Sequence, residues 1–235
     1  MGCDIHPAIE YRKSATAPWH ALMRKNPYAG RWEGETEFTA SLDIDRNYDL
    51  FAILGNVRNG RGFAGIVTGS GFDPMSDCRG VPEDISPEAK AALSDGHSAT
   101  WVILKEILEY NWDRSTTHIG VVNGPEYTEW QRCIEWNAAP KSYCDGVSGG
   151  GIVNVSEEAM KANIEAIKTQ YTEKEHAQVV CAIENTLHDT YTKVSWSQPY
   201  TETTIQMWTT ILPPMLNLGR QYGYENVRLV MDFDS

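Results

Sequence analysis

The sequence lacks the features that mark several classes of protein. Its 235 residues contain five cysteines, an odd number with no C-x-x-C pair, which argues against a disulfide framework and a structural zinc site. No apolar run approaches the ~20 residues of a membrane-spanning helix, and the start of the chain shows no basic and then apolar leader. We therefore expect reduced thiols, a cytoplasmic location and no membrane partner.

Positive charge is also scarce in this chain. There are 20 Lys and Arg residues against 32 Asp and Glu residues, which gives a formal net charge of -12, and no basic run or stripe occurs. Such a protein repels a polyanion at long range, so nucleic acid is not an expected partner. A small anion in a locally basic pocket is compatible with this balance.

What is present fits a globular α+β protein. Hydrophobic residues make up 41% of the chain and charged residues 22%, enough for a sizeable core. Strand patterns at both ends and helical patterns between them predict a mixed β-sheet that includes both terminal strands, with helices packed on it. With no clear linker or repeat, we expect a single globular domain over 1–235. It has a long Gly- and Pro-rich loop at about 60–85, and loops of that length are more often functional than idle.

The opening segment MGCDIHPAIEYR predicts a strand with two unlike faces. Period-two alternation puts Asp4, His6 and Glu10 on one face, and Ile5 and Ile9 on the other. The closing segment, 226–233, alternates in the same way. If the terminal strands are neighbours, the ionisable face of the first strand lies near Arg228 and Asp232.

One predicted helix entrance differs from the others. The helices expected to begin after Asn47, Ser86, Ser156 and Thr172 each carry an acidic residue early, which occupies the site where a helix N-terminus attracts anions. The helix expected to open at His97 and Ser98 carries none until Glu106. This entrance is suited to a phosphate or carboxylate, with His97, Ser98 and Thr100 as donors and Trp101 beside them. An ordinary capping role for Ser98 is an equally good interpretation.

Three arginines lie near a predicted helix and the Gly-rich loop that follows it. Arg46, Arg58 and Arg79 are candidates for bidentate recognition of an anion, together with Tyr48, Asn56 and Asn59. Surface salt bridges with the abundant Asp and Glu residues are the alternative for each arginine.

The Asp4-x-His6 pair is typical of a divalent metal site or of a general acid/base pair. It is similar to the D-x-H element that begins the metallophosphoesterases, and His97 is a further candidate ligand. However, Val57 and Arg58 stand where that family has a His and an acid, and no G-D-x-x-D or G-H-x-H follows. We expect no cofactor and leave a divalent metal open, with a structural ion pair as the alternative. No complete catalytic motif is present, so no catalytic residue is assigned.

Several motifs taken together carry a resemblance over nearly the whole chain. They are MGCDIH followed by Glu10 and Arg12, RNYDLFAILGNVRN at 46–59, RGVPEDIS at 79–86, His97-Ser98 with Trp101, and VRLV followed by Phe233-Asp234. This set resembles a family of small, mostly uncharacterised proteins of bacteriophages and prophages. The resemblance implies a viral accessory protein in the cytoplasm of a bacterial host. Ala99 departs from it, since another polar residue or His is expected there in many relatives.

We expect the chain to bind a small phosphate-bearing, nucleotide-derived molecule without turnover, and in a phage to sequester an immune signal of the host. One alternative is a metal-dependent hydrolase of a nucleotide or phosphoester that uses Asp4, His6 and His97. A second alternative is a protein-protein inhibitor of a host factor, and a homo-oligomer is compatible with the sequence. The predicted ligand-binding residues are Asp4, His6, Glu10, Arg46, Tyr48, Asn56, Arg58, Asn59, Arg79, His97, Ser98, Thr100 and Trp101.

Overall fold

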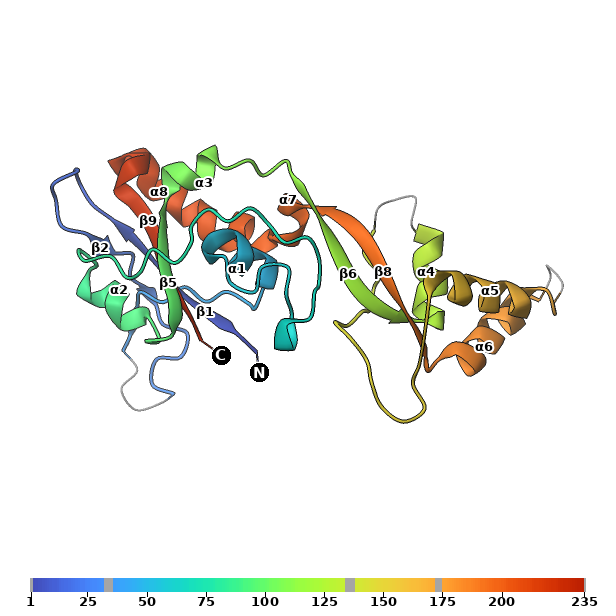
Figure 1. Ribbon diagram of the computed structural model, residues 1–235. Coiled ribbons are helices and arrows are strands. Elements are labelled where there is room, and N and C mark those ends of the chain that lie inside the picture. The colour runs from blue at the N-terminus through green and yellow to red at the C-terminus, as the bar shows by residue number, and fades with distance from the viewer. Residues whose placement is uncertain (1, 32–35, 134–137, 172–174, 235) are drawn as a thin grey trace. The chain divides into compact units, whose positions relative to one another are not determined.

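The computed structural model describes residues 2–31, 36–133, 138–171 and 175–234 (Figure 1). The chain groups into two compact units. Unit 1 consists of Met1–Asn59, Phe72–Asp113 and Tyr200–Ser235, and unit 2 of Gly60–Gly71 and Arg114–Pro199. The sequence alone predicts one domain, because the chain passes between the units several times and the Gly-rich stretch at 60–71 is part of unit 2.

Unit 1 is built on a four-stranded antiparallel sheet in the order β2-β1-β9-β5. Its strands are β1 (Asp4–Tyr11), β2 (His20–Ala21), β5 (His97–Ile103) and β9 (Val227–Asp234). A separate pair consists of β3 (Arg24–Lys25) and β4 (Phe38–Thr39). The helical segments of unit 1 are α1 (Tyr48–Gly55), α2 (Pro87–Ala92), α3 (Leu104–Glu109), α7 (Tyr200–Thr203), the π-helical η3 (Met207–Ile211), α8 (Leu212–Tyr222) and the short 3-10 turn η4 (Tyr224–Asn226).

The two terminal strands are neighbours in this sheet, as Figure 1 shows. The register pairs Asp4 with Asp234, His6 with Asp232, and Glu10 with Arg228. The α+β class and the place of both terminal strands in a sheet are therefore confirmed. The predicted approach of the ionisable face of β1 to β9 is confirmed as well.

The two faces of the sheet are covered differently. The apolar face of β1 contributes Ile5 and Ile9 to the main core of unit 1, together with residues of α1, α8 and η3. Helix α1 begins where the sequence predicts, because the Asn47 side chain accepts a hydrogen bond from the backbone N–H of Leu50 at 3.0 Å. On the other face, the small side chains of Ala8, Ala21 and Ala40 pack with Ala89 of α2.

The segment 97–103 is a strand, so the prediction of a helix that opens at His97 is wrong. Residues 100–103 are Thr, Trp, Val and Ile, which favour a strand, and β5 pairs with β9 along most of its length. The helix starts later, at Leu104. Its first turn contains Glu106, whose carboxylate accepts a hydrogen bond from the Ile103 N–H at 2.9 Å. No acid-free entrance therefore exists here.

Unit 2 consists of a three-stranded mixed sheet with helices beside it. Strand β6 (Ser115–Asn123) is antiparallel to β8 (Thr190–Pro199), and β7 (Val153–Val155) is parallel to β8. The helices are α4 (Gly124–Cys133), α5 (Glu157–Lys168) and α6 (His176–Leu187). Ser156 caps α5 as predicted. The helix predicted to begin after Thr172 has its first residues at 172–174, which lie outside the described residues.

The long loop predicted at about 60–85 is present. Its described residues contain one short helical turn, η1 (Phe63–Gly65), and isolated bridges from Arg61 to Val67 and from Gly69 to His118. In the described ranges, no helix of either unit is long and apolar enough to cross a membrane.

Candidate functional site

The predicted site residues of unit 1 bond mainly to one another and to neighbouring side chains. Asp4 and Arg46 form a bidentate ion pair, with both N–H···O distances at 2.8 Å. The hydrogen bond from Arg46 lowers the pKa of Asp4 below its usual range. His6 Nε2 lies 3.1 Å from a carboxylate oxygen of Asp234. Both pairs are partly exposed at the end of the sheet.

Glu10 belongs to a buried ion-pair network. Its side chain is 0% exposed, and Arg228, which is 4% exposed, donates to it from Nε at 2.7 Å. The other Glu10 oxygen accepts the backbone N–H of Ser86, also at 2.7 Å. Arg228 donates in addition to Asp84 at 2.7 Å, and its guanidinium lies 4.0 Å from the ring centre of Trp19. Although burial alone raises it, the bond with Arg228 holds the pKa of Asp84 below its usual value.

Asp232, which the sequence predicts near the ionisable face of β1, belongs to a second buried polar network. Asp232 is 2% exposed, and its carboxylate accepts the N–H of Ser94, the hydroxyl of Ser94 and the N–H of Gly96. These bonds join β9 to the chain just before β5, so the residue has a structural role.

Tyr48 and Arg58 lie together beside the start of β1. The hydroxyl of Tyr48 accepts the backbone N–H of Cys3 at 3.3 Å, and the Arg58 guanidinium lies 5.0 Å from the centre of the Tyr48 ring. Burial raises the pKa of the Cys3 thiol, and Arg58 opposes that rise. This arginine is thus engaged with the protein's own aromatic ring and thiol.

The amides of Asn56 and Asn59 fasten the loop that follows α1. Asn59 donates to the Asn56 side chain and to the Phe72 carbonyl, both at 2.8 Å, and accepts the Phe72 N–H at 2.6 Å. Asn56 itself has a left-handed backbone, with φ of 57°, and donates to Asp77 at 3.3 Å. These bonds hold the loop in its conformation, so both residues have a structural role.

The third predicted arginine, Arg79, is paired as well. It forms a bidentate ion pair with Glu106 at 2.7 and 2.9 Å and donates to the Trp101 carbonyl at 3.0 Å. Burial raises the pKa of Glu106, but the bonds from Arg79 and from the Ile103 N–H bring it below its usual value. Of the two interpretations of Arg79, anion recognition and a salt bridge with an acidic residue, these contacts agree with the salt bridge.

The remaining predicted residues lie along β5. His97 Nδ1 is 2.9 Å from the Ser98 hydroxyl, and the His97 ring stacks on Phe233 with ring centres 6.5 Å apart. Thr100 is buried and shares a hydrogen bond of 2.7 Å with the Ser76 hydroxyl. No group of three or more His, Cys, Asp or Glu side chains among the described residues is placed to hold a metal ion.

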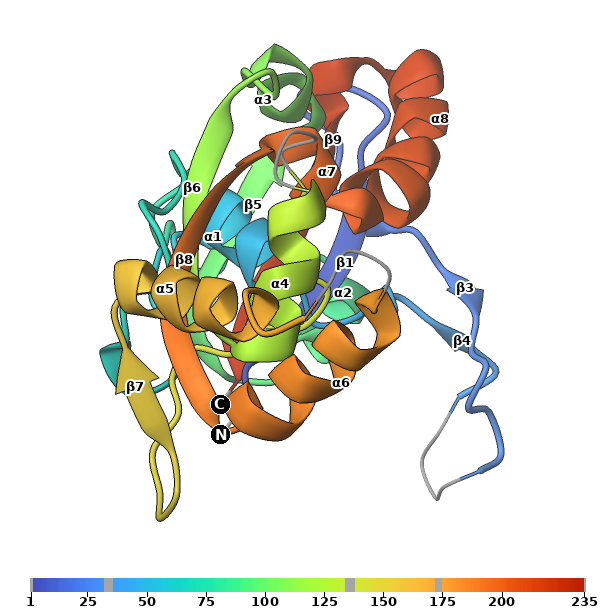
Figure 2. The same ribbon diagram turned by 90° about the vertical axis from the view of Figure 1, so that its right-hand side faces the viewer.

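Unit 2 contains a pocket of about 840 Å³ between α4, α5 and α6. The three helices lie next to one another in Figure 2, and contacts join each pair of them. Each helix contributes residues at helical spacing: 127, 128 and 131 from α4, 161, 164, 165 and 168 from α5, and 176, 179, 180, 183 and 184 from α6. A volume of this size is typical of small-molecule sites.

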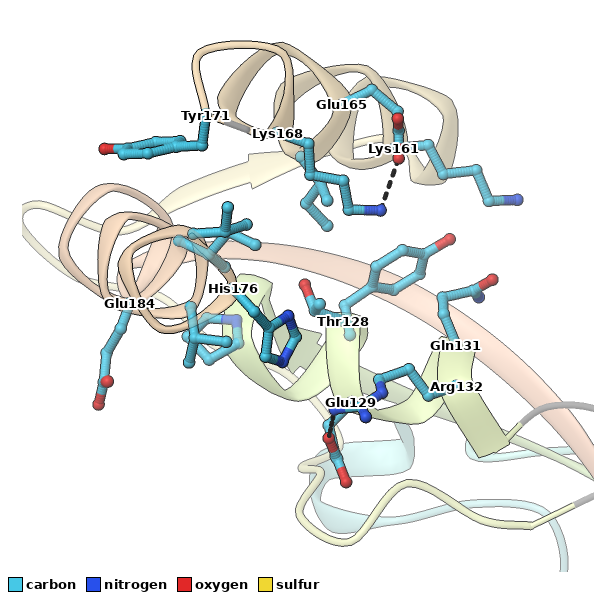
Figure 3. A pocket seen from close by; sticks show the side chains of 16 residues that line it. Thr128, Glu129, Gln131, Arg132, Lys161, Glu165, Lys168, Tyr171, His176 and Glu184 are labelled. Carbon is cyan, nitrogen blue, oxygen red and sulfur yellow. Dashed lines mark hydrogen bonds and ion pairs between the residues drawn. The ribbon is translucent and has the colours of Figure 1, made fainter. Parts of the chain in front are cut away.

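The lining of this pocket has an apolar floor and a polar rim. Aliphatic and aromatic side chains form the floor, among them Tyr127, Ile164, Tyr171, Val179 and Ile183. The rim includes three cationic side chains, which come from two helices; they are Arg132, Lys161 and Lys168. Figure 3 shows Lys168 and His176 in the middle of the pocket, with Tyr171 and Gln131 toward opposite ends of the view.

Each cation at the rim is paired with a carboxylate of its own helix, and all three cationic side chains are exposed. Lys168 contacts Glu165 at 2.7 Å and Arg132 contacts Glu129 at 3.3 Å. The Lys168 side chain is 47% exposed. Exposed pairs of this kind contribute roughly 0–1 kcal/mol, so a stronger anion can displace them.

The sequence pattern does not reveal this pocket. The amphipathic pattern of 157–171 indicates a helix with one buried face, but its Lys and Glu residues are indistinguishable from an ordinary solvated face. Comparison of the chain with protein-family models, with curated proteins and with solved structures gave no match. The assignment of function therefore depends on the geometry of the pocket.

Proposed function

We propose that this protein binds a small phosphate-bearing, nucleotide-derived molecule in the pocket of unit 2 and does not transform it. The observation that carries the proposal is a pocket of about 840 Å³ with an apolar floor and a rim of weakly paired cations. An aromatic or aliphatic part of the ligand contacts the floor, and its phosphate replaces the carboxylates that now face Lys168 and Arg132.

Two features of the pocket support this ligand chemistry. Tyr171 supplies a flat ring at one end of the pocket, and aromatic side chains stack on planar ligands. The cationic side chains of α4 and α5 reach the pocket from two sides, and an Arg or Lys next to a phosphate forms charge-assisted hydrogen bonds. The resemblance to phage and prophage proteins extends the proposal: the bound molecule is an immune signal of the bacterial host, and binding sequesters it.

Calorimetric titration with cyclic nucleotides and ADP-ribose derivatives tests the proposal. We expect saturable binding of at least one of them, and absence of binding across the whole panel overturns the proposed function. The complex is then denatured and the released molecule is weighed by mass spectrometry. Recovery of the intact molecule supports capture, whereas recovery of a cleaved product supports the alternative of a hydrolase.

A further inference from the structure

A second pocket lies entirely within unit 1. It is formed by the segment 12–19, which joins β1 to β2, and by residues 84–87 at the start of α2. Its volume of about 520 Å³ is in the range of small-molecule sites. Two side chains of opposite charge line it, Arg12 and Asp84, and most of the other lining residues are apolar, Trp19 among them.

The guanidinium of Arg12 has hydrogen-bonding capacity left for a ligand. Its Nε donates to Asn226 at 2.9 Å, and its central carbon lies 4.6 Å from the ring centre of Trp19. Among the described residues, the two terminal nitrogens of Arg12 have no hydrogen-bond partner and the side chain forms no ion pair. The residue is partly exposed, so a small solute reaches it. Two terminal nitrogens of a guanidinium form a fork that binds a carboxylate with parallel hydrogen bonds.

Asp84 supplies the opposite charge and is held in place by other partners. Arg228 donates to one of its carboxylate oxygens at 2.7 Å, and the indole N–H of Trp19 donates to the other at 2.8 Å. The Asp84 side chain is nevertheless 61% exposed. Each carboxylate oxygen has two lone pairs, so both can accept a further N–H donor. The pocket therefore offers a donor fork and a carboxylate that are fixed separately and are not paired with each other.

We propose that this pocket binds a free amino acid with an apolar side chain. The carboxylate of the ligand pairs with Arg12, and its ammonium group donates to Asp84. Its side chain lies against the apolar wall that includes Trp19 and Ile85. A simple anion is repelled by Asp84 and a simple cation by Arg12, whereas a zwitterion pairs with both. Because Asn226 and Arg228 already hold the two charged groups, little side-chain ordering opposes binding. The site is separate from the pocket of unit 2 and does not depend on the ligand proposed there.

Calorimetric titration of the wild-type protein with L-leucine, L-isoleucine, L-methionine and L-phenylalanine tests the proposal. We expect at least one of them to bind with one-to-one stoichiometry. Its amide lacks the carboxylate and its N-acetyl derivative lacks the ammonium group, so each should bind at least about tenfold more weakly. Absence of binding by all four amino acids overturns the proposal. Equal affinity for the N-acetyl derivative also overturns it, because the site would then recognise an anion alone.

Two substitutions locate the binding in this pocket. Arg12→Gln removes both terminal donors and should weaken the amino acid by about tenfold or more. Arg220→Gln, at an exposed position of α8 that is not among the residues of this pocket, is the matched control and keeps the wild-type affinity. Ala15→Trp, at an exposed position that lines the pocket, fills the space without touching the charged groups and should abolish binding. Circular dichroism checks that each variant is folded, and wild-type affinity in a folded Arg12→Gln or Ala15→Trp overturns the assignment.

Discussion

The polar groups of the two units are used in opposite ways. In unit 1, Glu10, Arg228 and Asp232 are buried and bonded to one another or to backbone N–H groups. In unit 2, the cations around the pocket are exposed and form exposed or partly exposed ion pairs with carboxylates of their own helices. A dense set of ionisable residues on a strand is therefore weaker evidence for a ligand site than a pocket whose polar groups are still available.

Loss of Arg228 should have the largest effect on stability. Arg228→Ala leaves the carboxylate of Glu10 buried and uncompensated, which we expect to lower the free energy of unfolding by roughly 3–5 kcal/mol. Chemical denaturation measures the change. Lys105→Ala, which breaks an exposed pair with Glu225, is the control and should cost under about 1 kcal/mol. Equal effects of the two variants would contradict the contrast between buried and exposed pairs.

A second prediction concerns the dependence of stability on pH. Burial raises the pKa of Asp49 to about 7, so the folded chain keeps a proton that the unfolded chain releases near pH 4. The contribution of this group to the free energy of unfolding is fully present below pH 4 and is lost as the pH rises to 7. Between pH 5 and pH 8 the wild type should lose about 2 kcal/mol more than Asp49→Asn. Parallel pH profiles of the two proteins would rule out the raised pKa.

The buried hydroxyl of Thr100 should have a smaller effect. It shares a hydrogen bond with Ser76 and accepts the N–H of Arg79 at 3.2 Å, so Thr100→Val leaves buried polar atoms without a partner. We expect a loss of about 1–2 kcal/mol in the free energy of unfolding. Thr117→Val, at an exposed position of β6, is the control and should change stability by less than about 0.5 kcal/mol. A neutral Thr100→Val would show that this network adds nothing to stability.

Substitution of Lys168 should have the smallest effect on folding and a clear effect on binding. Lys168→Ala removes an exposed ion pair, which costs under about 1 kcal/mol in stability. The affinity for the phosphate-bearing ligand should fall by about tenfold, because a charge-assisted hydrogen bond is worth roughly 1.5–3 kcal/mol. Lys141→Ala, an exposed lysine that is not among the pocket residues, is the control. An unchanged affinity in Lys168→Ala would place the phosphate elsewhere.

Much of the fold of unit 1 follows from local sequence. Alternation along both ends of the chain predicts that the ionisable face of β1 meets Arg228 and Asp232, and the register confirms it. Helix starts at Asn47 and Ser156 follow from side-chain capping, which depends on a few adjacent residues. These features are predictable because their causes lie close together in sequence or repeat with a clear period.

The segment around His97 shows where local reasoning fails. Trp101, Leu104 and Ile107 have the spacing of a helix, but Trp101 belongs to β5 and the other two to α3. Residues 97–103 form a strand because they pair with β9, which lies more than a hundred residues later in the sequence. The pocket of unit 2 could not be predicted for a related reason: it exists only when α4, α5 and α6 pack together.

Filling the pocket of unit 2 tests most directly whether the ligand binds there. Val180 lines the pocket on α6 and is 46% exposed, so Val180→Trp fills the space at little cost to the fold. Val153→Trp, at a 51% exposed position of β7 that is not among the pocket residues, is the matched control. Calorimetric titration with the ligand identified for the wild type should show binding lost in Val180→Trp and kept in Val153→Trp. Equal binding by both folded variants would contradict the assignment of the site.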